Sequence, residues 1–360
     1  MEKYIYFHRD IDLYNTEQFG AFLYEFMENI QISKLLGRIL VLPNAFIAPR
    51  NNKKIVDTQK ISLKSASLIP LEYLIDIKLL EKVVPIISLP DFYELTYKGD
   101  NVLVHNSNNI RDNTNYSLKT SFDNINIEKQ VKMPCNMTTI LQNINVLHTI
   151  SNKNLIFYNY GRLPQPNWHN ATNLDYKIIR TALNFTPYVL EKSEQFIRKN
   201  NIVRDNTLTV HWRVGDRSLE TLKSGGIPFS KYESETLQYF DKFNELSSPA
   251  NIIKNILEIK LKNNTINTVF LVHNNADNKA LEYVNTELAK FKVKIVEFYN
   301  KETEPFCEQY EGMIQQIIGA HCKYQLYGPT CYERMSAFGR WIIETSMYNV
   351  GFAPVVSFIG

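Results

Sequence analysis

The chain has 360 residues, 44% of them hydrophobic and 12% aromatic, which is enough to fill the cores of about two domains. Its 40 Lys and Arg residues nearly balance its 37 Asp and Glu residues, so the net charge is only +3. This balance argues against a nucleic-acid partner, whose binding depends on cationic contacts with phosphates, and no apolar run reaches the roughly 20 residues of a membrane-spanning helix.

The first half begins with a pattern that predicts a parallel βαβ unit. Residues 3–7 read as a strand, apolar residues recur at helical spacing from Phe19 to Leu36, and residues 39–42 form a second short strand that Pro43 ends. The polar loop before the helix therefore follows the first strand. In open α/β sheets, ligands bind at this carboxyl end of the strands.

The rest of the first half gives a less regular pattern. Residues 95–135 are rich in Asn, Ser and Lys, and we predict a loop insertion there. The remaining predicted elements are helices over 69–76, 77–84 and 175–200, the last interrupted by Pro187, and strands over 84–90 and 155–160.

Strands and helices alternate more clearly in the second half, which predicts a doubly wound α/β domain. The predicted strands are 208–212, 268–272, 293–298 and 324–326, and the predicted helices are 249–262, 278–290, 310–322 and 336–346. We place an N-terminal domain at 1–195, a C-terminal domain at 196–345 and a C-terminal tail at 346–360.

The segment His211-Trp212-Arg213-Val214-Gly215-Asp216 directly follows a predicted buried strand. His211 and Arg213 are two residues apart, so they project to the same face of the strand. Asp216 lies in the turn that follows. Arg is suited to bidentate contact with phosphate or carboxylate, so the segment predicts either an anion site or a strand-end Arg–Asp ion pair beside a packed His.

The other motifs mainly exclude classes of nucleotide-binding protein. No GxGxxG follows a strand and no GxxxxGK[ST] is present, which disfavours a dinucleotide enzyme and a P-loop NTPase. Asp10-Ile11-Asp12 has the spacing of a metal-binding DxD motif, although such tripeptides are common, and we predict no metal site. The segment Val272-His273-Asn274-Asn275 ends a predicted strand and is a candidate for contact with a ribose or base, and a loop-capping role is the alternative.

The N-terminal residues indicate no secretory leader, because the stretch from Met1 to Arg9 is charged and lacks the apolar core of a signal peptide. As the sequence stands, we expect a cytoplasmic protein, or one of the secretory pathway if a leader has been removed. The four cysteines have neither CxxC spacing nor paired His residues, so a zinc site is not expected.

Several blocks resemble the GDP-fucose protein O-fucosyltransferases, a GT-B fucosyltransferase superfamily. The third block reads His-x-Arg-x-x-Asp, as in that superfamily, and the last two resemble its closing helix and its Ser-Thr-Phe-Ser phosphate-binding turn. In chain order the blocks are 19–43, 69–92, 211–216, 313–322 and 336–338. Their order and spacing strengthen the resemblance.

The resemblance implies an α/β protein of GT-B fold, with two Rossmann-like domains facing across a cleft. It also implies an inverting fucosyltransferase that takes fucose from GDP-fucose to a hydroxyl acceptor, Ser or Thr of a protein, without an obligatory metal or other cofactor. Arg213 would contact the β-phosphate and the bridging oxygen, and His211 would help to shape the nucleotide site. Asp216 would orient Arg213 or contact the nucleotide.

Two further parts of the site follow from the same resemblance. Ser336, Ala337 and Phe338 would form the phosphate-binding turn at the start of a helix. The loop around Glu17 resembles the Pro-Glu-Gly-Phe-Asn loop of the subfamily that modifies thrombospondin-type repeats, in which the Glu is the catalytic base. The alternative for Glu17 is a first-turn or capping residue of the helix that follows.

The chain departs from the family pattern at three positions. Gly20 stands where the loop usually ends in Asn, Gln315 where the late helix usually carries Asp, and Ala337 where the turn usually has Thr. These departures motivate an alternative, a catalytically silent GT-B-like protein that binds a nucleotide sugar or a partner. Gly215-Asp216 also resembles the HxRRGD motif of α-1,2-fucosyltransferases, which act on glycans.

Overall fold

The computed structural model describes thirteen stretches of the chain, and these fall into two compact units, Met1–Thr186 and Pro187–Gly360. The described residues are 2–9, 19–42, 44–46, 68–96, 100–105, 127–132, 144–150, 152–159, 174–213, 242–274, 277–299, 307–328 and 337–359.

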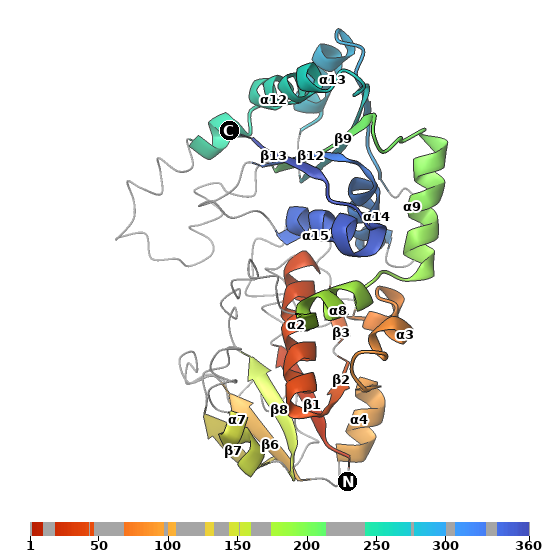
Figure 1. The fold of residues 1–360 in the computed structure, drawn as a ribbon. Helices are drawn as coiled ribbons and strands as arrows, with labels where there is room; N and C mark the ends of the chain where they lie inside the picture. Colours follow the sequence, from red (N-terminus) through yellow and green to blue (C-terminus); the bar gives the residue numbers. More distant parts are fainter. Residues whose placement is uncertain are drawn as a thin grey trace, which may run out of the picture. The chain divides into compact units, whose positions relative to one another are not determined.

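The first unit is built on six parallel strands in the order β5-β2-β1-β8-β6-β7 (Figure 1). The strands are β1 (Tyr4–Arg9), β2 (Ile39–Val41), β5 (Ile86–Ile87), β6 (Asn101–His105), β7 (Ile127–Lys132) and β8 (Asn154–Asn159). A separate antiparallel pair is formed by β3 (Asn44–Phe46) and β4 (Leu68–Pro70).

The helices of this unit include α2 (Phe19–Leu36), which has the bounds that its apolar spacing predicts. Gly37 follows it with a positive φ of 61°, a conformation that glycine adopts without strain and that commonly ends helices. The others are η1 (Leu71–Tyr73), α3 (Ile77–Leu80), α4 (Leu89–Thr96), α7 (Ile144–Thr149) and α8 (Leu174–Ala182). Phe92 of α4 packs against Tyr4 and Tyr6 of β1, with ring centroids 5.9 and 6.1 Å apart.

The predicted loop insertion over 95–135 is wrong in two places, because this stretch supplies β6 and β7 of the sheet. Val102, Leu103 and Val104 are all buried. A run of three apolar residues between Asn and His is too short to distinguish a strand from a loop by periodicity. The pairing of β6 with β8, which follows it by many residues, is a long-range contact that the local pattern does not contain.

The second unit is built on five parallel strands in the order β11-β10-β9-β12-β13. The strands are β9 (Thr207–Arg213), β10 (Thr268–Asn274), β11 (Lys294–Val296), β12 (Tyr324–Gly328) and β13 (Val355–Phe358). Counted along the chain within this unit, the order is 3-2-1-4-5, that of a Rossmann domain. The direction of winding therefore reverses between β9 and β12, and this reversal is where such sheets bind ligands.

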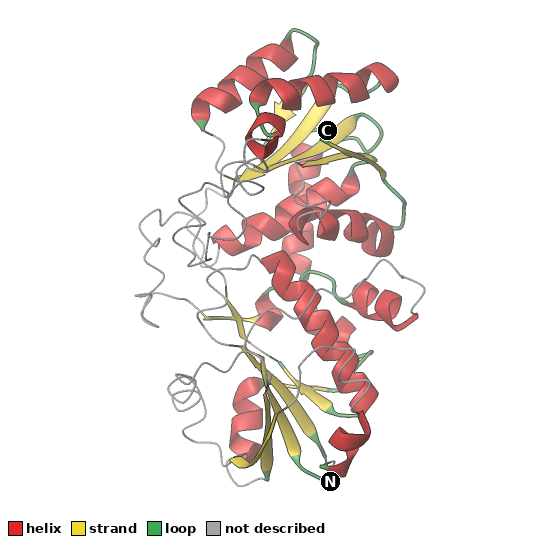
Figure 2. Ribbon diagram, turned by 90° about the vertical axis from the view of Figure 1, so that its left-hand side faces the viewer, coloured by secondary structure: helices red, strands yellow, loops and turns green. Residues whose placement is uncertain are grey.

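Helices cover both faces of this sheet (Figures 1 and 2). Leu208, Val210 and Trp212 of β9 lie in one core cluster with residues of α12 and α13. On the other face, Thr209 of β9 donates a hydrogen bond to the carbonyl of Gly319 in α14 at 3.0 Å. The helices are α9 (Pro187–Lys199), α12 (Pro249–Lys262), α13 (Asn278–Ala289), α14 (Cys307–His321), α15 (Ala337–Thr345) and the π-helix η3 (Ser346–Val350).

Gly319 allows α14 to approach the sheet closely. A Cβ atom at this position would lie 3.1 Å from Cγ2 of Thr209 and 3.2 Å from Cγ2 of Ile342 in α15. Both distances are tighter than ordinary van der Waals contact between carbon atoms. The absence of a side chain at Gly319 thus brings three elements, α14, β9 and α15, into contact at one point.

Two boundaries differ from the predicted ones. The first unit ends at Thr186, before the predicted boundary at 195, and α9 is the first helix of the second unit, where Tyr188 packs against Tyr310 of α14. Residues 346–360, predicted as a tail, include β13, which pairs in parallel with β12. This edge strand is partly exposed along its length, so its sequence lacks the continuous apolar run of a buried parallel strand.

Within the described stretches, no helix is both long enough and apolar enough to cross a membrane. Cys322 is a free and fully buried thiol, and its burial raises its pKa to about 12. It therefore remains protonated and unreactive at neutral pH.

Arg38 fastens the amino-terminal edge of the first sheet. Its side chain is 3% exposed, and Nη1 donates hydrogen bonds to the carbonyls of Lys153 at 2.7 Å and Tyr4 at 3.2 Å. These carbonyls lie at the starts of β8 and β1, so one side chain joins two neighbouring strands. Burial lowers the pKa of Arg38 to about 10, which leaves it charged at neutral pH.

Replacing Arg38 with Ala is expected to lower the free energy of unfolding by about 2–3 kcal/mol, because two backbone carbonyls lose a charged donor. Denaturant unfolding measures this loss. Lys34→Ala is the matched control, since Lys34 pairs with Asp175 at the surface and such a pair contributes less than about 1 kcal/mol. Equal losses in the two variants would contradict the role given to Arg38.

Candidate functional site

The candidate site lies at the carboxyl end of β9, at the reversal point of the second sheet. His211 and Arg213 project from the same face of this strand, as the sequence predicts, while Trp212 between them is buried on the other face. The indole of Trp212 donates to the carbonyl of Ser247 at 2.8 Å. This contact fixes the strand end, and with it the direction in which its neighbours point.

The His211 ring is 8% exposed and stacks on the ring of Phe338, with centroids 5.3 Å apart and an interplanar angle of 24°. Phe338 lies in the first turn of α15. The structure therefore brings together two predicted site residues from distant parts of the sequence. Arg213, two residues further along the same strand, is half-buried at the strand end.

A network of buried hydrogen bonds lies next to His211 and stabilises this arrangement. Tyr327 of β12 lies beside His211, with ring centroids 6.3 Å apart, and its hydroxyl donates to Oε1 of Gln325 at 2.7 Å. The Gln325 side-chain amide donates in turn to Oγ of Ser346 at 2.9 Å, and Ser346 Oγ donates to the carbonyl of Ala320 at 2.8 Å. These buried bonds connect β12 to Ala320 near the end of α14 and to Ser346, the first residue of η3.

The remaining predicted residues cannot be placed as side chains. Glu17, Asp216 and Ser336 lie outside the described residues, as does the Asp10–Asp12 motif. For Asn274 and Ala337 the structure describes the backbone. Asn274 ends β10 directly opposite Arg213 in the strand register, and Ala337 begins α15. Within the described stretches, no three His, Cys, Asp or Glu side chains gather in a way that could hold a metal ion.

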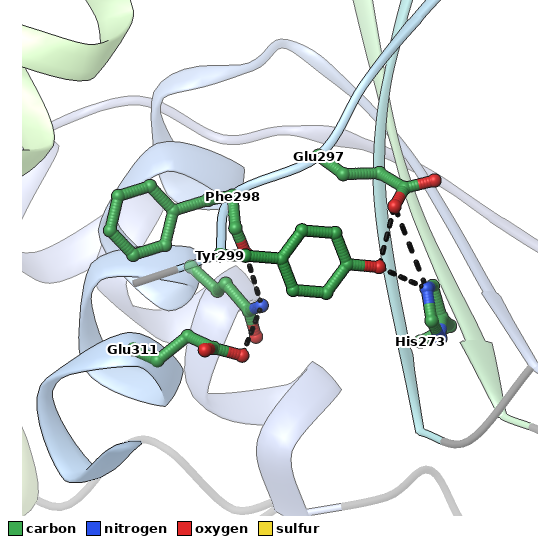
Figure 3. Close-up of polar contacts among 6 residues, drawn as sticks. His273, Glu297, Phe298, Tyr299 and Glu311 are labelled. Carbon is green, nitrogen blue, oxygen red and sulfur yellow. Dashed lines mark hydrogen bonds and ion pairs between the residues drawn. The ribbon is translucent and has the colours of Figure 1, made fainter. Parts of the chain in front are cut away.

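A second polar group lies at the same edge of the sheet (Figure 3), and His273 is its one member that the sequence predicts. Nε2 of His273, near the end of β10, is 2.6 Å from the Tyr299 hydroxyl. That hydroxyl donates to Oε2 of Glu297 at 2.5 Å, and His273 Nε2 is 3.8 Å from the same oxygen. Glu297 and Tyr299 directly follow β11. We call His273, Glu297 and Tyr299 the edge cluster.

Glu297 is an ionised acceptor in this cluster. Burial raises the pKa of its carboxyl group, but the hydrogen bonds and charge supplied by His273 and Tyr299 outweigh burial, and the net pKa is lowered. The Glu297 side chain is 21% exposed. A partly accessible carboxylate is therefore held in its charged form.

Gln315 of α14 holds the segment that carries the cluster. Its Nε2 atom donates to the Phe298 carbonyl at 3.0 Å and to Oε1 of Glu311 at 3.2 Å (Figure 3). The Phe298 ring packs edge-on against Phe196 of α9, with centroids 5.1 Å apart. Gln315, a departure from the family pattern, thus fixes the backbone between Glu297 and Tyr299.

For Glu297 and Tyr299 the sequence contains one general signal and no specific motif. Residues 293–298 are predicted as a strand of the second domain, so polar residues at its end are expected at the ligand edge. The prediction places that end at residue 298, beyond the last strand residue, Val296, and so assigns Glu297 to the strand itself.

No protein-family profile matches the chain, and no curated protein matches its sequence. Solved structures do match its fold. The crystal structure of POFUT1 in complex with GDP-fucose has a TM-score of 0.62 and 14% identity, covering 100% of this chain and 98% of that one. The complex of POFUT1 with GDP has a TM-score of 0.63, with the same identity and coverage.

A weaker likeness links the chain to the fucosyltransferase NodZ from Bradyrhizobium, with a TM-score of 0.49 and 13% identity over 95% of this chain and 91% of that one. The POFUT1 structures match the chain from end to end, including both parallel sheets. The expected fold class, α/β of the GT-B type with two Rossmann-like units, is therefore confirmed, and the chain has the fold of POFUT1.

Proposed function

We propose that the chain is an inverting glycosyltransferase that moves fucose from GDP-fucose to a hydroxyl group, that of Ser or Thr in an acceptor protein. The observation that carries this proposal is the stacking of His211 on Phe338 beside Arg213. It places the start of a nine-residue helix against the strand that carries Arg213, at the reversal point of a Rossmann sheet. The shared fold with POFUT1, solved with GDP-fucose and with GDP, supports the same donor.

In this proposal the diphosphate binds between Arg213 and the turn formed by Ser336, Ala337 and Phe338. The N-terminus of α15 offers backbone N–H groups and the positive end of the helix dipole, both of which favour an anion. His211 shapes the pocket through its ring. Asp216 orients Arg213 or contacts the nucleotide, and Asn274 contacts the ribose or base.

The chemistry requires stabilisation of the leaving group. As the bond from fucose to the diphosphate oxygen breaks, positive charge develops on the sugar, as in glycoside hydrolysis, and negative charge gathers on GDP. Arg213 and the α15 amides stabilise that negative charge without an obligatory metal ion or other cofactor. Glu17 takes the proton of the acceptor hydroxyl, which then attacks the opposite face of the sugar.

The second candidate is a silent GT-B-like protein that binds a nucleotide sugar or a partner. The observation in its favour is the role of Gln315, which occupies the place of the usual family Asp. Its amide group is engaged with the Phe298 carbonyl and with Glu311. A neutral residue that holds a loop replaces a charged residue there, and the donor site of such a protein need not support turnover.

Arg213→Ala tests the proposal most directly. We expect turnover of GDP-fucose, measured as release of GDP, to fall by about 100- to 1,000-fold, because a donor to the developing charge is lost. Arg198→Ala is the matched control, since Arg198 is exposed on α9 of the same unit. Full turnover in the Arg213 variant would overturn the central assignment. Absence of turnover in the wild-type protein, with GDP still bound, would favour the silent alternative.

Glu17→Gln separates donor binding from transfer. The variant is expected to bind GDP with unchanged affinity, because the base does not touch the nucleotide, and to lose transfer to an acceptor by about 100-fold or more. Calorimetry with GDP and transfer of labelled fucose to acceptor proteins measure the two effects. If transfer persisted at the wild-type rate, Glu17 would be a helix-capping residue and another group would be the base.

A further inference from the structure

The edge cluster lies at the same end of the same sheet as Arg213. Strands β9, β10 and β11 are consecutive neighbours, and adjacent strands are about 4.8 Å apart. Glu297, which follows β11, is therefore about two strand spacings, or about 10 Å, from the end of β9. A nucleoside diphosphate is long enough to span this distance, and in Rossmann sheets the bound nucleotide runs along this edge.

Glu297 has an acceptor oxygen to offer. Its Oε2 atom is engaged by Tyr299 and His273. Within the described part of the chain, Oε1 has no hydrogen-bond partner, and Figure 3 shows it turned away from both of these neighbours. The carboxylate is ionised at neutral pH because its pKa is lowered. Hydrogen bonds to an ionised acceptor are about twice as strong as those between neutral groups.

The cluster is also held rigidly before any ligand arrives. Phe298 lies between the two cluster residues that follow β11, and both its ring and its carbonyl are fastened, the ring to Phe196 and the carbonyl to Gln315. His273 and Tyr299 fix the orientation of the Glu297 carboxylate. A group that is already in place loses little conformational freedom on binding, which favours affinity.

We propose that the Glu297 carboxylate, oriented by His273 and Tyr299, binds the nucleoside part of the donor nucleotide by accepting hydrogen bonds from its N–H or O–H groups. This inference rests on the proposed function for the donor, and it adds the residues that recognise the end of the nucleotide remote from the reaction. Two sources share this chemistry, the N–H edge of a base and the hydroxyl groups of a ribose.

The test compares two ligands that share phosphate groups and differ in the nucleoside. Calorimetry on the full chain measures the affinities of GDP and of inorganic pyrophosphate for the wild-type protein, Glu297→Gln and the control Glu287→Gln. Glu287 is on α13 and pairs with Lys290. We expect Glu297→Gln to weaken GDP by about 10- to 100-fold, as for the loss of a charged hydrogen bond, and to leave pyrophosphate unchanged. The control should change neither.

Inosine diphosphate, which lacks the 2-amino group, and 2′-deoxy-GDP distinguish the two sources. If wild-type protein discriminates against inosine diphosphate and Glu297→Gln does not, the carboxylate binds the base. The same result with 2′-deoxy-GDP assigns it to the ribose. Tyr299→Phe keeps the carboxylate but removes the hydroxyl that orients it, so a smaller loss of GDP affinity is expected. Thermal unfolding of each variant confirms that it is folded.

The outcomes separate this inference from the proposed function. Equal GDP affinity in wild-type protein and Glu297→Gln would overturn the inference and leave the proposed function standing. If ADP or UDP bound in place of GDP, with an affinity that depended on Glu297, the inference would hold and the GDP-fucose donor would be overturned. If none of these nucleotides bound to the wild-type protein, both would be overturned.

Discussion

The second unit depends on the burial of β9 on both of its faces. Residues 207–212 of this strand are all buried, and β10 and β12 bond to its two edges. A strand enclosed in this way cannot slip by one residue, because every side chain would then move to the opposite face. The direction in which His211 and Arg213 point is therefore set by the packing of the whole unit. The orientation of the proposed site residues therefore depends on the packing of the core.

The same edge is supported by contacts of several different kinds. An aromatic stack joins His211 to α15, and a chain of buried hydrogen bonds joins Tyr327 to the start of η3 and the end of α14. Gln315 joins α14 to the segment after β11. None of these contacts needs a ligand to form. The candidate site is thus preorganised: contacts with neighbouring residues fix the groups that would bind a nucleotide.

Features of the fold and of the candidate site could be predicted from the sequence where they depend on residues that are close together in the chain. Helix α2 and helix α12 were predicted to the residue, because apolar spacing along a helix is a local property of the sequence. The pairing of β6 with β8 and of β13 with β12 was not, since strand neighbours distant in sequence leave no local trace. His211 and Arg213 were found because they share one strand. Glu297 was not predicted, because its contact with His273 joins residues of two strands that are distant in sequence.

The missing side chain at Gly319 has a consequence for how this protein tolerates change. At this point α14, β9 and α15 meet so closely that a methyl group would be in tight contact with Thr209 and Ile342. Gln315 lies one helical turn earlier on the same helix. A side chain at residue 319 would require Thr209, Ile342 or α14 itself to shift by a few tenths of an ångström, and a shift of α14 would move Gln315 and the segment after β11. A residue outside the candidate site thus sets the spacing between α14 and the sheet, and a larger residue there would alter the position of the segment that carries Glu297 and Tyr299.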